Sequence, residues 1–357
     1  MLAMGAVYQL IAVVTQQSIY SIKLGFIHFG LYSIGVFGLY ISLGSFELTG
    51  MIIFGSLTVG AVIIFLVNVF LTIQHSRLKN TVISASTSAL FYLGLTVISG
   101  VLIVLNFQFS ILGEFHHVLL IGHLWMGLIG WFLFLIVGYS FKMLPMFYLA
   151  HGHKESWQKW ILISLHLCIW VGIFGAVIGK GTSILPIGLG LLTMGLVMFI
   201  VQIREIQKKR FKKNPGKGIV FFVFLVYFFT LLVGGLFIVS LVNPHFIWQS
   251  NLLTLILVFY ILGFVSLSIL AYLSKIIPFL WWTFRYGKQV GQQETPSLAI
   301  MIDETVVHRK LWLLFISLLL FIVGLGTGES FVIAATSILF AFSTVYYLFT
   351  IVKAFTY

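Results

Sequence analysis

The chain has 357 residues, of which 61% are hydrophobic and 8% are charged, and its formal net charge is +12. A soluble domain carries about 25% charged residues, so this composition excludes a water-soluble fold and predicts an all-α polytopic membrane protein. The single cysteine, Cys168, excludes an internal disulfide and a thiolate metal cluster.

Eleven apolar runs predict the membrane spans, because a spanning helix needs about 20 apolar residues. In chain order they cover 1–16, 24–44, 48–74, 84–107, 116–148, 158–180, 184–203, 219–242, 247–284, 311–327 and 330–352. The first run is short for a span. The runs 116–148 and 247–284 are too long for one straight span, so we expect each to contain an interfacial segment or a strong tilt.

The distribution of charge predicts the orientation of these spans. The loop 204–218 holds seven basic residues and one acidic residue. With eleven spans, all of the 20 basic residues except Lys180 fall on the side of this loop. This is the positive-inside pattern, so we expect a multi-pass protein of the cell membrane with its basic loops in the cytoplasm. The basic loop is expected to attract the anionic headgroups of the lipid bilayer, and no nucleic-acid partner is expected.

A sequence motif recurs at equal spacing along the chain. "GYSFKMLP" and "AYLSKIIP" share one layout, and "GAVYQLIA" is a fainter copy; they begin at Gly138, Ala271 and Gly5, so successive copies lie 133 residues apart. Such a period accommodates four spans. We therefore expect one transmembrane domain, 1–357, of three pseudo-repeated four-helix arcs at about 1–80, 81–213 and 214–357. The first helix of the first arc would lie before Met1.

The Lys–Pro pair of this motif has a simpler interpretation as a membrane anchor. The proline would end or kink its helix at the edge of the membrane. The lysine, three residues earlier, would extend to the lipid headgroups. This interpretation explains the pair and leaves the equal spacing of the copies unexplained.

The segment "HLWMGLIGWFLFLIVGYSFKMLPMF", His123 to Phe147, resembles a pattern of membrane proteins related to subunit I of haem–copper oxidases, including the NnrS-type branch. "MGAVYQLIAV" near the start and "KIIPFLWWTFRYG" at 275–287 resemble the other copies in such proteins. The resemblance covers nearly the whole chain. It implies twelve helices in three arcs, with haem and copper ligands on the second helix of each arc. It also implies an N-terminally truncated chain and an oxidoreductase that acts on nitric oxide or oxygen with an electron donor.

Three departures from that pattern bear on the chemistry. The position of His123 projects back beyond the start of the chain and forward onto Ile256, which cannot bind a metal. The tyrosine that an oxidase carries four residues after this histidine is replaced by Gly127. All eight acidic residues fall at span ends or in loops. Oxygen reduction coupled to proton pumping is therefore not expected.

The histidines near the outer end of the run 116–148 are the first candidate site. Imidazole is the commonest ligand of haem iron and copper, and an ionisable residue at membrane depth suggests function. His116 precedes His123 by seven residues, so both lie on one helical face, and His117 is adjacent. We expect His123, His116 and His117 as metal ligands. The alternative is an interfacial histidine pair that contacts water, with a structural His123.

His28 and His166 form a second candidate pair, each one span after a Lys–Pro-type helix. The glycines that follow them would admit a flat macrocycle or a neighbouring helix. We expect His123, His166 and His28 as cofactor-binding residues for haem. The alternative for His28 and His166 is helix packing, with each imidazole bonded to a backbone carbonyl.

Two functions remain open from the sequence. The first is a haem- or copper-binding membrane protein related to respiratory oxidases, active in redox chemistry or in a response to nitric oxide or oxygen. The second is a cofactor-free membrane transporter or scaffold on the same three-arc fold. The resemblance around His123 favours the first, and the lost ligand at Ile256 favours the second.

Overall fold

The computed structural model describes residues 1–113 and 115–356. Helices make up 84% of it, and the described residues contain no strand, which confirms the all-α class. Within the described residues, ten helical stretches are long and apolar enough to cross a membrane. The chain divides into two compact units, Met1–Met143 with Glu155–Phe199 and Leu144–Lys154 with Ile200–Tyr357.

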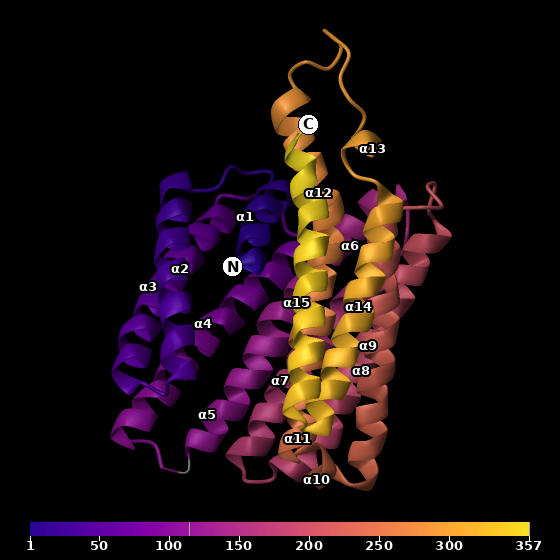
Figure 1. The fold of residues 1–357 in the computed structure, drawn as a ribbon. Helices are drawn as coiled ribbons and strands as arrows, with labels where there is room; N and C mark the ends of the chain where they lie inside the picture. Colours follow the sequence, from indigo (N-terminus) through magenta and orange to yellow (C-terminus); the bar gives the residue numbers. More distant parts are fainter. Residues whose placement is uncertain (114, 357) are drawn as a thin grey trace. The chain divides into compact units, whose positions relative to one another are not determined.

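The first unit contains the helices that carry the candidate histidines (Figure 1). In chain order they are α1 (Leu2–Thr15), α2 (Ile22–Gly44), α3 (Leu48–Gln74), α4 (Thr81–Phe109), α5 (Phe115–Leu124), the π-helical segment η1 (Trp125–Leu133), α6 (Phe134–Tyr148), α7 (Ser156–Val177) and α8 (Gly181–Lys208). The last residues of α6 and α8 belong to the second unit. With 14 residues, α1 is shorter than a span.

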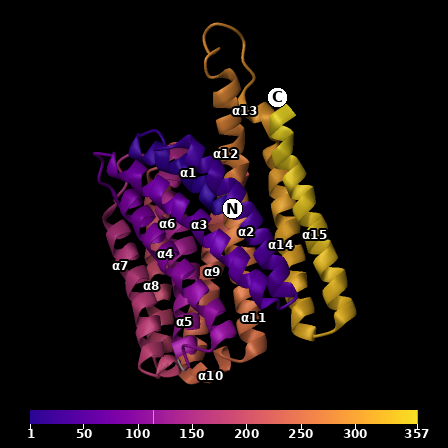
Figure 2. The same ribbon diagram turned by 90° about the vertical axis from the view of Figure 1, so that its left-hand side faces the viewer.

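The second unit contains the remaining helices. They are α9 (Lys217–Val242), α10 (Pro244–Ile247), α11 (Ser250–Val258), the π-helical segment η2 (Phe259–Ser266), α12 (Leu267–Tyr286), α13 (Leu298–Met301), α14 (Glu304–Thr327), α15 (Ser330–Val352) and the 3₁₀ turn η3 (Lys353–Thr356). Figure 2 shows α14 and α15 side by side. The helix expected at 311–327 begins earlier, at Glu304, because the Asp303 carboxylate accepts the backbone N–H groups of its first turn.

Polar residues fix where several helices begin. The side chains of Ser21, Asn80 and Glu47 accept hydrogen bonds from backbone N–H groups in the first turns of α2, α4 and α3. These N–H groups have no partner within their own helix. The caps therefore satisfy donors that would be costly to leave unpaired beside an apolar environment, and they explain why the predicted span boundaries agree with the structure.

Two glycines bring α2 and α3 into close contact. A Cβ atom on Gly35 would lie 2.9 Å from the backbone nitrogen of Thr58, and one on Gly38 would lie 2.2 Å from the ring of Phe54. Small residues permit such approach between membrane helices. The glycines after His28 therefore admit a neighbouring helix.

The two over-long runs share a local irregularity. Each contains a π-helical segment, η1 in the run 116–148 and η2 in the run 247–284, and the last residues of these segments, Leu133 and Ser266, lie 133 residues apart. This is the period of the sequence motif. A π-helical segment stands where an interfacial segment or a tilt was expected, and such segments are frequent at functional sites.

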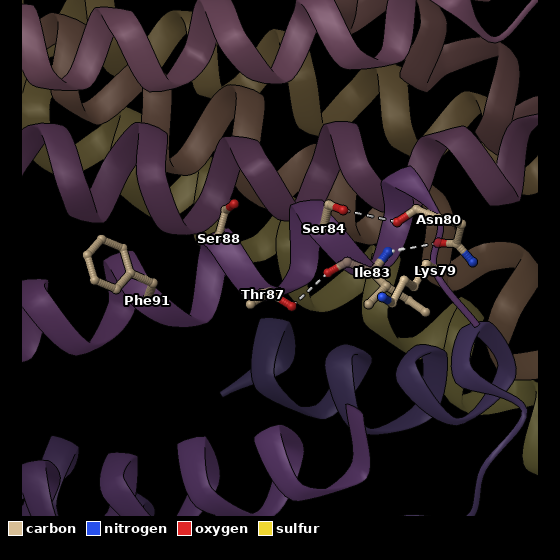
Figure 3. Close-up of a pocket in the computed structure, with 7 residues that line it drawn as sticks. All are labelled: Lys79, Asn80, Ile83, Ser84, Thr87, Ser88 and Phe91. Carbon is tan, nitrogen blue, oxygen red and sulfur yellow. Dashed lines mark hydrogen bonds between the residues drawn. The ribbon is translucent and has the colours of Figure 1, made fainter. Parts of the chain in front are cut away.

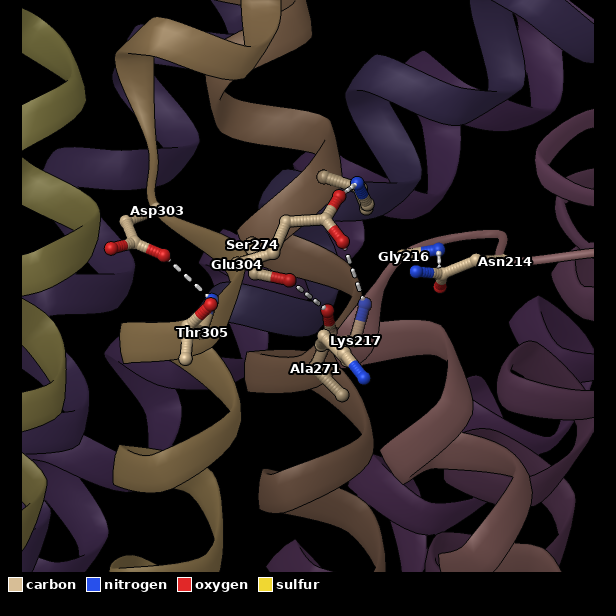
Figure 4. A network of polar contacts seen from close by, with 9 residues as sticks. Asn214, Gly216, Lys217, Ala271, Ser274, Asp303, Glu304 and Thr305 are labelled. Carbon is tan, nitrogen blue, oxygen red and sulfur yellow. Dashed lines mark hydrogen bonds and ion pairs between the residues drawn. The ribbon is translucent and has the colours of Figure 1, made fainter.

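The Lys–Pro pair has different surroundings in its two clear copies. Helix α6 ends three residues after Pro145, whereas α12 continues for eight residues past Pro278. Lys142 is exposed. Lys275 forms an ion pair with Glu304, whose other carboxylate oxygen accepts the backbone N–H of Lys217 at 3.1 Å (Figure 4). The expected extension to lipid headgroups is therefore wrong for Lys275, because a carboxylate of α14 binds its ammonium group.

Candidate functional site

Five polar residues lie on one face of α4 and each contacts a histidine. Their spacing of four, four, three and seven residues places them within one stripe of the helix. We call this stripe the α4 seam; it consists of Ser88, Tyr92, Thr96, Ser99 and Asn106. Four of them contact a histidine through the side chain and Thr96 does so through its backbone carbonyl. The seam joins α4 to α5 and α7.

His166 of α7 is held by two hydroxyl groups of the seam. Its Nδ1 lies 2.6 Å from the hydroxyl of Tyr92, and its Nε2 lies 3.2 Å from the hydroxyl of Ser88. The ring also packs against Phe134, with 4.7 Å between ring centroids. Both ring nitrogens are thus engaged by side chains, whereas the packing alternative named a backbone carbonyl as the partner. As placed, His166 offers no nitrogen to a haem iron.

His123 of α5 is oriented by the backbone of α4. Its Nδ1 lies 3.0 Å from the carbonyl oxygen of Thr96 and 3.2 Å from the hydroxyl of Ser99. A carbonyl only accepts, so Nδ1 carries the proton and Nε2 keeps its lone pair. Among the described residues, Nε2 makes no hydrogen bond. This arrangement, with one ring nitrogen donating to a carbonyl, is typical of histidines that bind metals.

The ring of His123 fits against a glycine of α4. A Cβ atom on Gly100 would lie 3.1 Å from Cε1 of the imidazole. The small residue therefore lets the ring approach the carbonyl of Thr96 closely.

His116 faces α4 as His123 does, and His117 is exposed. The Asn106 amide nitrogen donates to His116 Nδ1 at 3.0 Å, while the amide oxygen accepts the backbone N–H of Leu112 at 2.7 Å. The prediction that His116 and His123 share a face is confirmed. The described residues contain no group of three His, Cys, Asp or Glu side chains placed to hold a metal ion. The expected copper set of His123, His116 and His117 stays a prediction.

His28 of α2 lies in a separate aromatic box. Its ring centroid is 5.2 Å from that of Phe65, 5.6 Å from that of Tyr32 and 5.8 Å from that of Tyr8. The residue is 5% exposed, and its Nε2 has no hydrogen-bond partner among the described residues. A buried polar atom without a partner costs about 1–3 kcal/mol, so this nitrogen is suited to a ligand.

The aromatic box of His28 touches the π-helical segment that follows His123. Phe65 packs edge-on against Trp131 of η1, with 6.0 Å between ring centroids. On the seam side, a Cβ atom on Gly130 of η1 would lie 2.5 Å from the ring of Tyr92. The segment η1 therefore contacts both the aromatic box of His28 and the α4 seam.

A groove of ≈ 570 Å³ opens at the N-terminal end of α4 (Figure 3). Its lining residues are Lys79, Asn80, Ile83, Ser84, Thr87, Ser88 and Phe91. Ser88 belongs to both the groove and the α4 seam, since its hydroxyl contacts His166. The groove and the α4 seam therefore share Ser88, which is the first residue of the seam.

The α4 seam has no counterpart one sequence period later. The positions 133 residues after its members lie on α9 and are occupied by Phe221, Leu225, Phe229, Leu232 and Val239. There Phe229 stacks on Phe264, with 4.1 Å between ring centroids. At these five positions α9 therefore carries only apolar side chains. The seam is therefore specific to the unit that carries the candidate histidines.

The α4 seam was not among the sites expected from the sequence, although the spacing of its polar residues is visible there. Polar residues at a spacing of four, four, three and seven recur along a helix of 29 residues that is otherwise mostly apolar. A stripe of this kind predicts a polar helix contact inside a membrane protein.

The candidate histidines can be tested against the cofactors that the resemblance implies. One or two imidazole nitrogens can hold a haem iron. His123 and His28 each present an unengaged Nε2, so they fit axial ligation, whereas His166 does not. A comparison with known protein-family models and with curated proteins found no match.

Proposed function

We propose that this protein is a haem-binding integral membrane protein related to subunit I of respiratory oxidases, with His123 as an axial ligand. The observation that supports this most is the hydrogen bond from His123 Nδ1 to the Thr96 carbonyl, 3.0 Å long. It fixes the tautomer, holds the ring plane and makes Nε2 a better electron donor. Haem iron, when bound, would supply a coordination position for nitric oxide or oxygen and accept electrons from a donor.

The α4 seam orients the ring of His123. Ser99 donates its own hydroxyl proton to the Thr96 carbonyl at 2.8 Å, next to the imidazole. The carbonyl thus receives two hydrogen bonds, and the ring of His123 is held by backbone rather than by a mobile side chain. His28 is a second candidate axial ligand, in its own aromatic box.

A cofactor-free transporter or scaffold is the second candidate function. Two observations favour it. Both ring nitrogens of His166 are satisfied by protein hydroxyls, and the residue one period after His123 is Ile256. On this view the α4 seam holds helices together and no imidazole binds a cofactor.

A reduced-minus-oxidised optical spectrum of the purified protein, with metal analysis, separates the two functions. We expect a Soret band in the wild type that is lost in His123→Ala. The matched control is His75→Ala, since His75 is exposed and its ring also contacts a backbone carbonyl, that of Leu71 at 2.7 Å. The control should keep the band. A colourless, iron-free protein with a normal far-ultraviolet helical spectrum would support the transporter or scaffold instead.

A further inference from the structure

Two loops of the second unit form a fixed surface that carries many cations. Ala150 forms an antiparallel bridge with Arg210, and the backbone N–H of Lys212 donates to the Tyr148 carbonyl at 3.0 Å. Gln207 donates to the Tyr148 hydroxyl at 2.9 Å. We call this surface, residues 148–154 with 204–217, the basic platform. Its backbone pairing holds side chains from two distant segments on one surface.

Most cations of the basic platform form no ion pair with a described residue. Lys208 pairs with Glu205 at 2.6 Å, and Arg204 donates to the Tyr227 hydroxyl at 3.0 Å. Five further cations are exposed and form no ion pair with a described residue: Lys154, Lys209, Arg210, Lys212 and Lys213. Like charges on one surface repel one another. The platform is therefore suited to an anion that lies across several of them.

An exposed aromatic residue stands among these cations. Phe211 is 87% exposed and lies between Arg210 and Lys212. Its backbone N–H points to the Leu149 carbonyl at 3.4 Å, which fixes the base of the side chain. An aromatic ring in water gains free energy by entering an apolar or interfacial region. A cation pair that flanks such a ring matches a ligand with an anionic head and an apolar body.

The position of the platform on the chain limits what can reach it. It joins α6, α8 and α9, which are long and apolar enough to span a membrane. Only eight residues separate the end of α8 from the start of α9, so the connection cannot extend more than about 14 Å from the helix ends before it must return. The cations on this connection therefore stay close to the ends of two helices that are long and apolar enough to span a membrane.

We infer that the basic platform is a binding site for anionic phospholipid, with the phosphate among these five exposed cations and an acyl chain against Phe211. Each basic residue near an anionic membrane surface strengthens the binding of the protein to that surface by about fivefold. The inference is independent of whether the protein binds haem, because none of the candidate histidines belongs to the platform.

The test counts the lipids that stay bound to the purified full-length protein. The protein is reconstituted in phosphatidylcholine containing a minor fraction of phosphatidylglycerol, released into mild detergent, and examined by native mass spectrometry. We expect the retained phosphatidylglycerol to fall by about fivefold or more when glutamine replaces Lys154, Lys209, Arg210, Lys212 and Lys213. A matched variant removes five exposed cations elsewhere, Lys23, Arg77, Lys79, Lys159 and Lys288, and should retain it.

Two further arms identify the ligand. Phe211→Ser should lower retention of the phospholipid but leave the weaker binding of soluble glycerol phosphate unchanged, because only the lipid has an acyl chain. An equal loss in both five-residue variants, or no loss in either, would overturn the site. Displacement of phosphatidylglycerol by an acidic peptide at lower concentration than by free phospholipid would overturn the lipid as occupant. Helical content by circular dichroism shows that each variant is folded.

Discussion

At the scale of single residues, the hydrogen bonds of the three candidate haem ligands distinguish them. His166 bridges two hydroxyls, His123 donates to a carbonyl, and His28 leaves one nitrogen without a partner among the described residues. Only the second and third arrangements leave a lone pair available in place. Depth in the membrane alone therefore does not make an imidazole a ligand. The hydrogen-bond partners of its ring nitrogens decide its role.

We expect the hydrogen bond between Tyr92 and His166 to stabilise the fold. Tyr92→Phe removes the hydroxyl 2.6 Å from Nδ1 and leaves that nitrogen without its partner, which costs about 1–3 kcal/mol for a buried group. We expect a lower apparent unfolding temperature in detergent, followed by intrinsic fluorescence or light scattering. Tyr40→Phe is the matched control, since Tyr40 is 75% exposed. Equal unfolding temperatures for the two variants would show that the bond does not stabilise the fold.

The sequence predicts which histidines are candidates but not which nitrogens are free. The seven-residue spacing of His116 and His123 was enough to place both on one face, and the structure confirms it. The partners of His166, by contrast, lie 74 and 78 residues away on another helix. A contact of that kind depends on the rotation and depth of two packed helices, which the pattern of a single helix does not contain.

At the scale of elements, the spans were predictable because hydrophobic length and capping act locally. Ser21, Glu47 and Asn80 mark helix starts by the chemistry of their own side chains. The π-helical segments were not predictable, since an added residue in a turn depends on neighbours such as Tyr92, which packs against Gly130 of η1. The start of α14 was missed because its first turn is polar.

The junction of α9, α12 and α14 depends on a single carboxylate. Glu304 of α14 pairs with Lys275 of α12 and accepts the backbone N–H of Lys217, the first residue of α9 (Figure 4). Glu304→Gln leaves the Lys275 ammonium, 21% exposed, without its anion. We expect a loss of about 1–2 kcal/mol, less than for a fully buried pair because both side chains reach solvent.

A double-mutant cycle tests whether this loss belongs to the pair. Lys275→Met with Glu304→Gln should be more stable than the sum of the single variants predicts, because the double change leaves no unpaired charge. The readout is again the apparent unfolding temperature in detergent. Additive single effects would mean that the two side chains do not stabilise each other.

At the scale of the whole molecule, the number of spans between two loops, odd or even, determines whether the loops lie on opposite sides of the membrane or on the same side. Between Asn214 and Glu329 lie α9, the run from α11 to α12, and α14, each part of a stretch long enough to span a membrane. If all three cross the membrane, these two residues lie on opposite sides. Four such stretches separate Lys79 from Asn214, so crossing by all four would put those two on the same side. The parity does not depend on α1, which with 14 residues is shorter than a span.

Cysteine labelling tests the parity and the cytoplasmic placement of the basic loops together. The native Cys168 is fully buried, so an impermeant maleimide should not label the wild type in intact cells. We expect Glu329→Cys to be labelled in intact cells, and Asn214→Cys and Lys79→Cys only after permeabilisation, because the positive-inside pattern keeps basic loops in the cytoplasm. All three positions are exposed. Labelling of Asn214→Cys and Glu329→Cys from the same side would mean that one of the three stretches between them does not cross, whereas the reverse pattern would keep the parity and invert the orientation.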